Sequence, residues 1–374
     1  MSFIKLIQCK ECGLTYQKDE IINRCKICNG SLDIILDYRK IKEVIKKTNF
    51  LKQRIWHWKY WMFYPVEREN KITLGEGGTP LMNSEYFGRA FDNLYLKLEN
   101  LNPTGSFKDR GSAVEITRAF ELNVNEVCCA STGNMGASVS AYCAKAGIKC
   151  TIFLPKNVSK QKISQIKIFG SKIVKVSGNF TRAFRACEEF SQKKKVYMVG
   201  DFPFRGEGEK SVGFEIADQL NFKSPNWIVC PMGNGTLIYS IYDAFRDFWK
   251  VGLIKKIPRF LGVQAEGCNP IVRAFERGLK FVKSLKKSKT LASAIDVPNP
   301  IDGAKALEVL RKSKGFAISV SDEEMKEAKK ELALREGIFA ELAGAASVAG
   351  ALKFKEELKG NVICIISGAG WKEF

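Results

Sequence analysis

The chain has 374 residues, of which 45% are hydrophobic and 11% aromatic, enough apolar material for a folded core, so a disordered chain is excluded. Its length predicts about two domains. Because His57 is the only histidine, a Ser-His-Asp arrangement could use only that residue, and a multi-histidine metal site is excluded. The formal net charge of +20 favours anionic partners, without choosing among nucleic acid, a membrane surface and anionic metabolites.

The twelve cysteines indicate a reducing environment. Eight of them are scattered through mostly apolar stretches, where a free cysteine behaves as a small buried hydrophobic residue. The first residues do not resemble a secretory signal, and no apolar run is long enough to span a membrane. We therefore expect a soluble, cytoplasmic protein without a membrane partner.

Residues 1–38 are predicted to form a zinc-ribbon-like module. Two C-x₂-C pairs, separated by twelve residues, contain its four cysteines: Cys9, Cys12, Cys25 and Cys28. Four thiolates at this spacing can complete a tetrahedral structural zinc site; the alternative is a degenerate ribbon that holds no metal. Five basic residues balance five acidic residues in this segment, so we expect a structural cap and no nucleic-acid partner.

Residues 39–374 are predicted to form one catalytic region. An aromatic-rich connector at 55–61, which contains His57, is expected to pack against the domain that follows it. From about residue 76, strand-like and helical stretches alternate, as in 124–130, 137–147 and 149–154, and again in 227–232, 237–249 and 260–265, with a late strand at 361–366. This alternation predicts an α/β fold whose parallel sheets carry helices on both faces. Ser321 and Glu324 predict a capping box at the start of a helix that ends near residue 336.

The loop at 102–111 contains the first candidate catalytic residue, Lys108. Ser106 and Asp109 are predicted to open a helix as a capping pair, which places Lys108 in its first turn. The positive end of a helix dipole disfavours an ammonium group, so this position helps to supply a neutral amine. Schiff-base chemistry requires such an amine.

Three further loops are rich in glycine and hydroxyl side chains and follow predicted strands. The loop at 131–136 offers two hydroxyls and an amide at a helix start, which suits a carboxylate or a phosphate. The loop at 233–236 suits a phosphate monoester but matches neither a dinucleotide-binding fingerprint nor a P-loop, and the last loop is 367–370. Together with the lysine loop they predict one phosphorylated cofactor and an anionic substrate at the ends of parallel strands.

The lysine loop Asn-Pro-Thr-Gly-Ser-Phe-Lys-Asp-Arg-Gly resembles the cofactor-lysine motif of pyridoxal-phosphate enzymes of the tryptophan-synthase β fold type, fold type II. Gly-Glu-Gly-Gly-Thr-Pro-Leu at 75–81 is similar to threonine synthases in particular. Further matches follow in the family's order: 131–134, 204–211, 231–235, 263–267, 320–324 and 367–370. The resemblance implies two open twisted-sheet lobes, the smaller at roughly 105–205 and the larger formed by the remainder, and a homodimer.

The resemblance also implies a role for each matching residue. Lys108 would hold pyridoxal 5′-phosphate through a Schiff base and relay protons. The other cofactor contacts would be Asn134 at the 3′ oxygen, Ser367 at the pyridine nitrogen, and Gly233, Asn234, Gly235 and Thr236 at the phosphate. The substrate contacts would be Ser131, Thr132 and Arg205, with Lys210 as a further candidate beside Arg205.

The implied activity is that of a carbon–oxygen lyase in threonine biosynthesis, which converts O-phospho-L-homoserine and water to L-threonine and phosphate. Met135, Leu237 and Gly344 depart from the family's usual pattern, which leaves substrate choice open. The alternatives are a related cofactor enzyme, such as a serine or threonine deaminase or an O-phosphoserine sulfhydrylase, and a non-catalytic or nucleic-acid-binding protein.

Overall fold

The computed structural model describes residues 2–131, 133–156 and 158–373. The chain forms two compact units, each built from two separate segments. Unit 1 comprises Met1–Gly77 and Lys108–Ser211, and unit 2 comprises Gly78–Phe107 and Val212–Phe374. Among the described residues, none of the helices combines the length and the hydrophobicity that a membrane crossing needs.

The first part of unit 1 is a small antiparallel sheet in the order β2-β1-β3, formed by β1 (Ile4–Cys9), β2 (Thr15–Tyr16) and β3 (Leu32–Leu36). Helix α1 (Tyr38–Lys47) follows and is capped by the side chain of Asp37. Next, a 3₁₀ segment at His57–Phe63 buries the predicted aromatic connector. The His57 ring stacks on Tyr64, and its Nδ1 lies 2.9 Å from Ser211 Oγ, so His57 is a packed core residue, as predicted.

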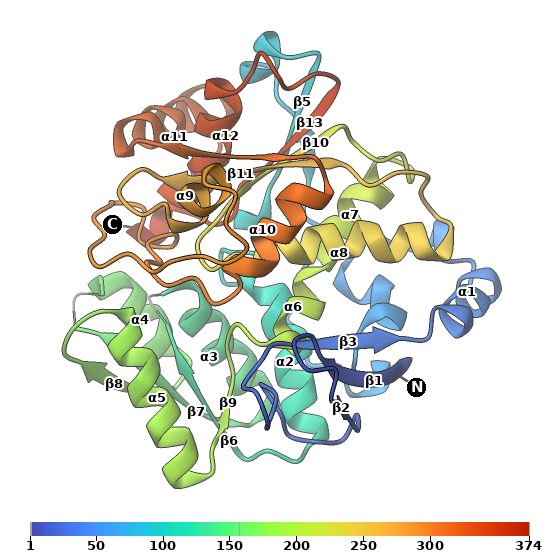
Figure 1. The fold of residues 1–374 in the computed structure, drawn as a ribbon, viewed down its shortest axis with the longest axis vertical. Helices are drawn as coiled ribbons and strands as arrows, with labels where there is room; N and C mark the ends of the chain where they lie inside the picture. The colour runs from blue at the N-terminus through green and yellow to red at the C-terminus, as the bar shows by residue number, and fades with distance from the viewer. Residues whose placement is uncertain (1, 132, 157, 374) are drawn as a thin grey trace. The chain divides into compact units, whose positions relative to one another are not determined.

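The rest of unit 1 is a parallel four-stranded sheet in the order β8-β7-β6-β9 (Figure 1). Its strands are β6 (Glu126–Ala130), β7 (Lys149–Pro155), β8 (Lys172–Val176) and β9 (Tyr197–Met198). Its helices are α2 (Lys108–Glu121), α3 (Asn134–Ala146), α4 (Lys160–Ile168), α5 (Phe180–Lys194) and α6 (Pro203–Glu209). Helices α3 and α5 contact the sheet, and α2 packs against both α3 and α6.

Unit 2 contains a six-stranded sheet in the order β12-β11-β10-β13-β5-β4, parallel except for the edge strand β4. Its strands are β4 (Leu81–Asn83), β5 (Asn93–Lys97), β10 (Trp227–Pro231), β11 (Arg259–Ala265), β12 (Phe316–Val320) and β13 (Asn361–Ile365). Its helices are α7 (Ser211–Gln219), which begins at the boundary, α8 (Thr236–Val251), α9 (Pro270–Glu276), α10 (Gly303–Lys312), α11 (Asp322–Glu336) and α12 (Leu342–Lys353). Alanine and glycine residues let the buried helix α12 pack closely against four strands, β10 to β13.

The α/β fold with parallel sheets is confirmed, and so is the capping box of Ser321 and Glu324 at the start of α11. The capping pair predicted at Ser106 and Asp109 is wrong. Residue 106 instead forms a backbone bridge with Gly368, and the buried Ser106 hydroxyl has no hydrogen-bond partner among the described residues. Tertiary pairing therefore overrides the local capping signal.

Candidate active site

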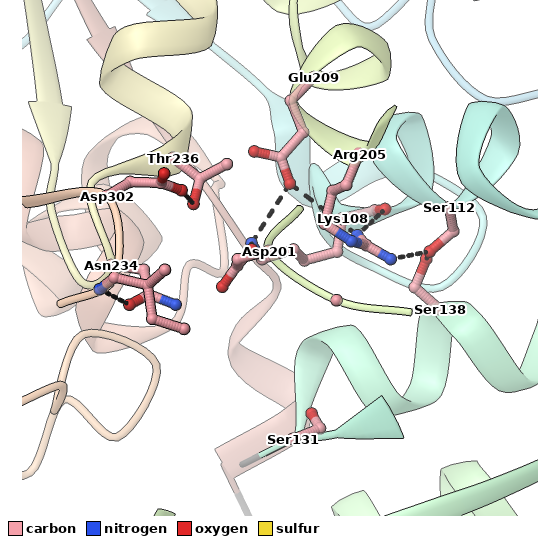
Figure 2. Close-up of polar contacts among 12 residues, drawn as sticks. Lys108, Ser112, Ser131, Ser138, Asp201, Arg205, Glu209, Asn234, Thr236 and Asp302 are labelled. Carbon is pink, nitrogen blue, oxygen red and sulfur yellow. Dashed lines mark hydrogen bonds and ion pairs between the residues drawn. The ribbon is translucent and has the colours of Figure 1, made fainter. Parts of the chain in front are cut away.

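Lys108 lies at the predicted position, as the first residue of α2 in unit 1. Its Nζ lies 3.3 Å from Asp201 Oδ1 and 3.2 Å from Glu209 Oε1. Figure 2 shows the lysine beside these two carboxylates. The lysine side chain is 15% exposed, and the Glu209 side chain is completely buried. The candidate catalytic amine thus lies between two carboxylates that the sequence analysis did not assign.

These carboxylates decide the charge of the free amine. Burial lowers the pKa of Lys108, but the charges of Asp201 and Glu209 outweigh it, and the net shift is upward. The neutral amine expected from the helix start is therefore wrong for the free side chain. Two carboxylates at about 3 Å outweigh a helix end that carries roughly half an elementary charge.

Arg205, predicted to bind substrate phosphate, is completely buried in unit 1. Its Nε and Nη2 donate to Glu115 Oε2 at 3.1 and 2.7 Å, and Nη2 and Nη1 also donate to Ser112 Oγ and the Lys108 carbonyl. Lys210 Nζ forms an ion pair with Glu207 at 2.6 Å. The substrate contacts of Arg205 and Lys210 remain predictions, and this geometry favours a structural ion pair for Arg205.

The loop before α3 supports a donor role for Ser131. Ser131 Oγ accepts hydrogen bonds from the N–H groups of Gly133, at 3.0 Å, and Gly136, at 2.8 Å, so both lone pairs are used and its hydroxyl hydrogen can donate to an acceptor. Asn134 is the first residue of α3 and is buried, and Thr132 lies outside the described residues. The aliphatic part of the Lys162 side chain covers Gly133, where an added Cβ would lie 2.4 Å from Lys162 Cδ.

The predicted phosphate loop of unit 2 precedes α8, which begins at Thr236. Gly235 has φ +94°, and a Cβ there would lie 2.9 Å from the Asp302 carbonyl, so the loop requires glycine. Asn234 Oδ1 accepts from Ile301 N at 2.8 Å, and Thr236 Oγ1 donates to Asp302 Oδ2 at 2.8 Å (Figure 2). The side chains of Asn234 and Thr236 thus fix the loop against Ile301 and Asp302. The backbone N–H groups at the start of α8 are then the donors of this loop that can bind an anion.

Ser367 follows β13 in unit 2 and is buried. Its hydroxyl donates to Glu341 Oε1 at 3.3 Å, and its carbonyl accepts from Phe107 N. Ser106 forms a backbone bridge with Gly368, the residue after Ser367, and its buried hydroxyl has no hydrogen-bond partner among the described residues. Such buried hydroxyl groups could hydrogen-bond the polar atoms of a small ring.

The four cysteines of the N-terminal sheet come together as predicted. Their sulfur atoms all lie within 4.8 Å of one another, with 3.4 Å between Cys9 and Cys28 and 3.6 Å between Cys12 and Cys25. The Tyr16 hydroxyl donates to Cys25 Sγ at 3.1 Å. This cluster could hold a tetrahedral metal ion.

Taken unit by unit, the donors fit pyridoxal phosphate: a lysine amine in unit 1, and in unit 2 a glycine-containing helix start and a buried serine hydroxyl. Sequence reasoning missed the carboxylates Asp201, Glu209, Glu115, Asp302 and Glu341. A signal existed for Glu209, because acidic residues alternate with glycine between Arg205 and Lys210. Only the basic residues of that motif, Arg205 and Lys210, were predicted as site residues.

The comparisons with known proteins agree with this fit. Residues 72–368 match the family model described as "Pyridoxal-phosphate dependent enzyme". The chain therefore belongs to the pyridoxal-phosphate-dependent enzymes, and the cofactor of this class is pyridoxal phosphate.

Sequence relatives show to which family within this class the chain belongs. The chain is 42% identical to the threonine synthase of Methanocaldococcus jannaschii over 98% of this chain and 93% of that protein. It is 43% identical to the threonine synthase of Methanosarcina acetivorans over 97% and 91%. Within its class, the chain belongs to the threonine synthase family.

Solved structures share the fold. Maize serine racemase has a TM-score of 0.70 at 20% identity and covers 78% of this chain and 88% of its own. A pyridoxal 5′-phosphate-dependent aspartate racemase has a TM-score of 0.69 at 22% identity and covers 89% and 94%. At these identities the likeness establishes the fold alone.

Proposed function

We propose that this chain is a carbon–oxygen lyase that converts O-phospho-L-homoserine and water to L-threonine and phosphate. The observation that carries the proposal is the 42% identity to a threonine synthase over 98% of the chain. The substrate is thus a phosphorylated amino acid. The deaminase alternative has weaker support, because a threonine deaminase of Solanum lycopersicum shares the fold at only 24% identity.

In this proposal Lys108 holds the cofactor, and the N–H groups of residues 233–236 bind its phosphate. Asn134 contacts the 3′ oxygen, and Ser367 contacts the ring nitrogen. The bound cofactor supplies an electron sink for charge on the substrate carbon. The chain's own residues do the rest: Lys108 moves protons at its Nζ, and the Ser131 hydroxyl donates to the substrate carboxylate.

The test compares products. The purified protein is expected to release phosphate and threonine from O-phosphohomoserine, and Lys108→Ala is expected to abolish both the release and the visible absorbance of the bound cofactor. Lys326→Ala, on the exposed side of α11, is the matched control and keeps both. Pyruvate from serine or 2-oxobutyrate from threonine, without phosphate release, would instead identify a deaminase.

The zinc site, the homodimer and the cytoplasmic location belong to the same proposal. The cysteine cluster supports one structural zinc ion per chain, because four thiolates leave no ligand position open. Metal analysis is expected to find one zinc, which Cys12→Ser loses and Cys268→Ser, a buried thiol of unit 2, keeps. A metal content that is the same in both variants would contradict the zinc site. The homodimer is tested separately, by sedimentation of the purified protein.

A further inference from the structure

Five buried or nearly buried charged groups form one cluster in unit 1. Lys108 and Arg205 supply two positive charges, and Asp201, Glu209 and Glu115 supply three negative charges. None of these side chains is more than 15% exposed. A change in the charge of Lys108 therefore has to be compensated inside the cluster, because water screens it poorly.

Glu209 is the member that depends most on Lys108. Its Oε1 lies 3.2 Å from Lys108 Nζ, and its buried Oε2 has no hydrogen-bond partner among the described residues. The Arg205 guanidinium is 3.9 Å away and donates to Glu115. When the lysine moves away, Glu209 therefore loses its close cation.

The charged groups that face Glu209 come from α2, from α6 and from the loop before α6. Lys108 is on α2, and Asp201 and Arg205 are on the loop before α6 and in α6 itself. Strand β3 also contacts α6, and its one charged residue, Asp33, forms no ion pair among the described residues. Asp201 carries the same charge as Glu209, so its presence adds to the cost of an ionised Glu209.

We propose that Glu209 takes up a proton when Lys108 leaves it to carry the cofactor, and that it gives up this proton when the free amine returns. The inference rests on the proposed role of Lys108. In the unloaded protein near pH 8, the pH of the test below, the pair is an ammonium and a carboxylate. In the loaded protein Glu209 is a neutral carboxyl whose proton comes from the solvent, and no other bond of Glu209 changes.

The direction of the pKa shift supports this exchange. Burial raises the pKa of Glu209 to about 7 even while the Lys108 ammonium lowers it. Loss of that ammonium removes the largest opposing charge, so the pKa of Glu209 rises further and the carboxyl is neutral at physiological pH. Lys108 Nζ, which relays protons during the reaction, then returns to Glu209, which lies 3.2 Å away in the unloaded protein. The Glu209 carboxyl already carries a proton at that point.

The test measures proton uptake during loading. Pyridoxal phosphate is added to protein freed of cofactor, in weak buffer near pH 8 with an indicator dye, while the visible absorbance of the bound cofactor reports loading. We expect the wild type to take up about one more proton per bound cofactor than Glu209→Gln. Glu188→Gln, which changes a partly buried carboxyl on α5 of the same unit, is expected to match the wild type.

The outcomes separate this inference from the proposed function. If the wild type gains no visible absorbance that depends on Lys108, the proposed function fails. If it loads but Glu209→Gln takes up as many protons as the wild type, the inference fails and the function stands. Infrared difference spectra of the wild type labelled with ¹³C-glutamate need no variant: loading is expected to produce the carbonyl band of a protonated carboxyl, and its absence overturns the inference.

Discussion

At the scale of single residues, the guanidinium of Arg205 and the carboxylate of Glu115 form a buried pair with two hydrogen bonds to one oxygen. Removal of one partner leaves an uncompensated charge in the interior, which costs about 3–5 kcal/mol of unfolding free energy. We therefore predict a loss of this size for Glu115→Ala in denaturant unfolding. A variant with the stability of the wild type would contradict a structural role of this pair.

The control for this prediction is an exposed ion pair. Glu308 and Lys312 pair at 2.6 Å on α10, where the Lys312 side chain is 59% exposed and the Glu308 side chain 39%. Such pairs contribute about 0.3–0.5 kcal/mol, so Glu308→Ala is expected to leave the midpoint of unfolding nearly unchanged. A loss comparable to that of Glu115→Ala would mean that the charge change itself, and not burial, sets the cost.

Glu209 also predicts how the stability of the cofactor-free protein depends on pH. Burial raises its pKa from 4.5 to about 7 in the folded state, so the folded protein binds this proton more tightly than the unfolded chain. The contribution is fully present below about pH 4.5 and is lost as the pH rises through 7. Across this pH range the unfolding free energy of the wild type is expected to fall by an amount on the order of 3 kcal/mol. Glu209→Gln is expected to abolish this fall.

Denaturant unfolding at pH 5 and pH 8 measures this difference. Glu308→Gln is expected to keep the fall that the wild type shows, because the Glu308 side chain is partly exposed to solvent. An equal fall in Glu209→Gln and in the wild type would contradict the shift. Because the measurement uses protein without cofactor, it is independent of the role of Lys108 in the reaction.

At the scale of secondary structure, the capping box of α11 offers a direct prediction. Ser321 Oγ accepts from Glu324 N at 3.0 Å, and Glu324 Oε2 accepts from Ser321 N at 2.7 Å. Ser321→Ala leaves the Glu324 N–H without its cap and is expected to cost about 1 kcal/mol of unfolding free energy. Ser177→Ala, at an exposed bend, is the control, and equal stability of the two variants would refute the role of the cap.

Helix and strand positions could be predicted from the sequence where no tertiary contact overrides the local signal. The Ser321 cap and the strand before Ser131 both follow from neighbouring residues. The contacts of the site could not be predicted, because Asp201 and Glu209 are 93 and 101 residues from Lys108. Likewise, Asp302, which fixes the Thr236 hydroxyl, is 66 residues away and follows an unremarkable turn.

At the scale of the whole molecule, the net charge of +20 predicts a dependence on salt. Like charges repel one another most in the compact state, and the screening length shortens from about 30 Å at 0.01 M salt to about 8 Å at 0.15 M. We expect the thermal midpoint of the protein to rise between these potassium chloride concentrations. A fall in the midpoint would mean that attractive ion pairs outweigh the repulsion.

The placement of β5 has a consequence for synthesis on the ribosome. This strand lies between β4 and β13, yet β13 is made about 265 residues after it. At the usual 5–20 residues per second, the nascent chain carries an unpaired strand edge for roughly 15–50 s. The larger sheet can therefore close only after translation is nearly complete, and until then the exposed edge is a natural target for chaperones.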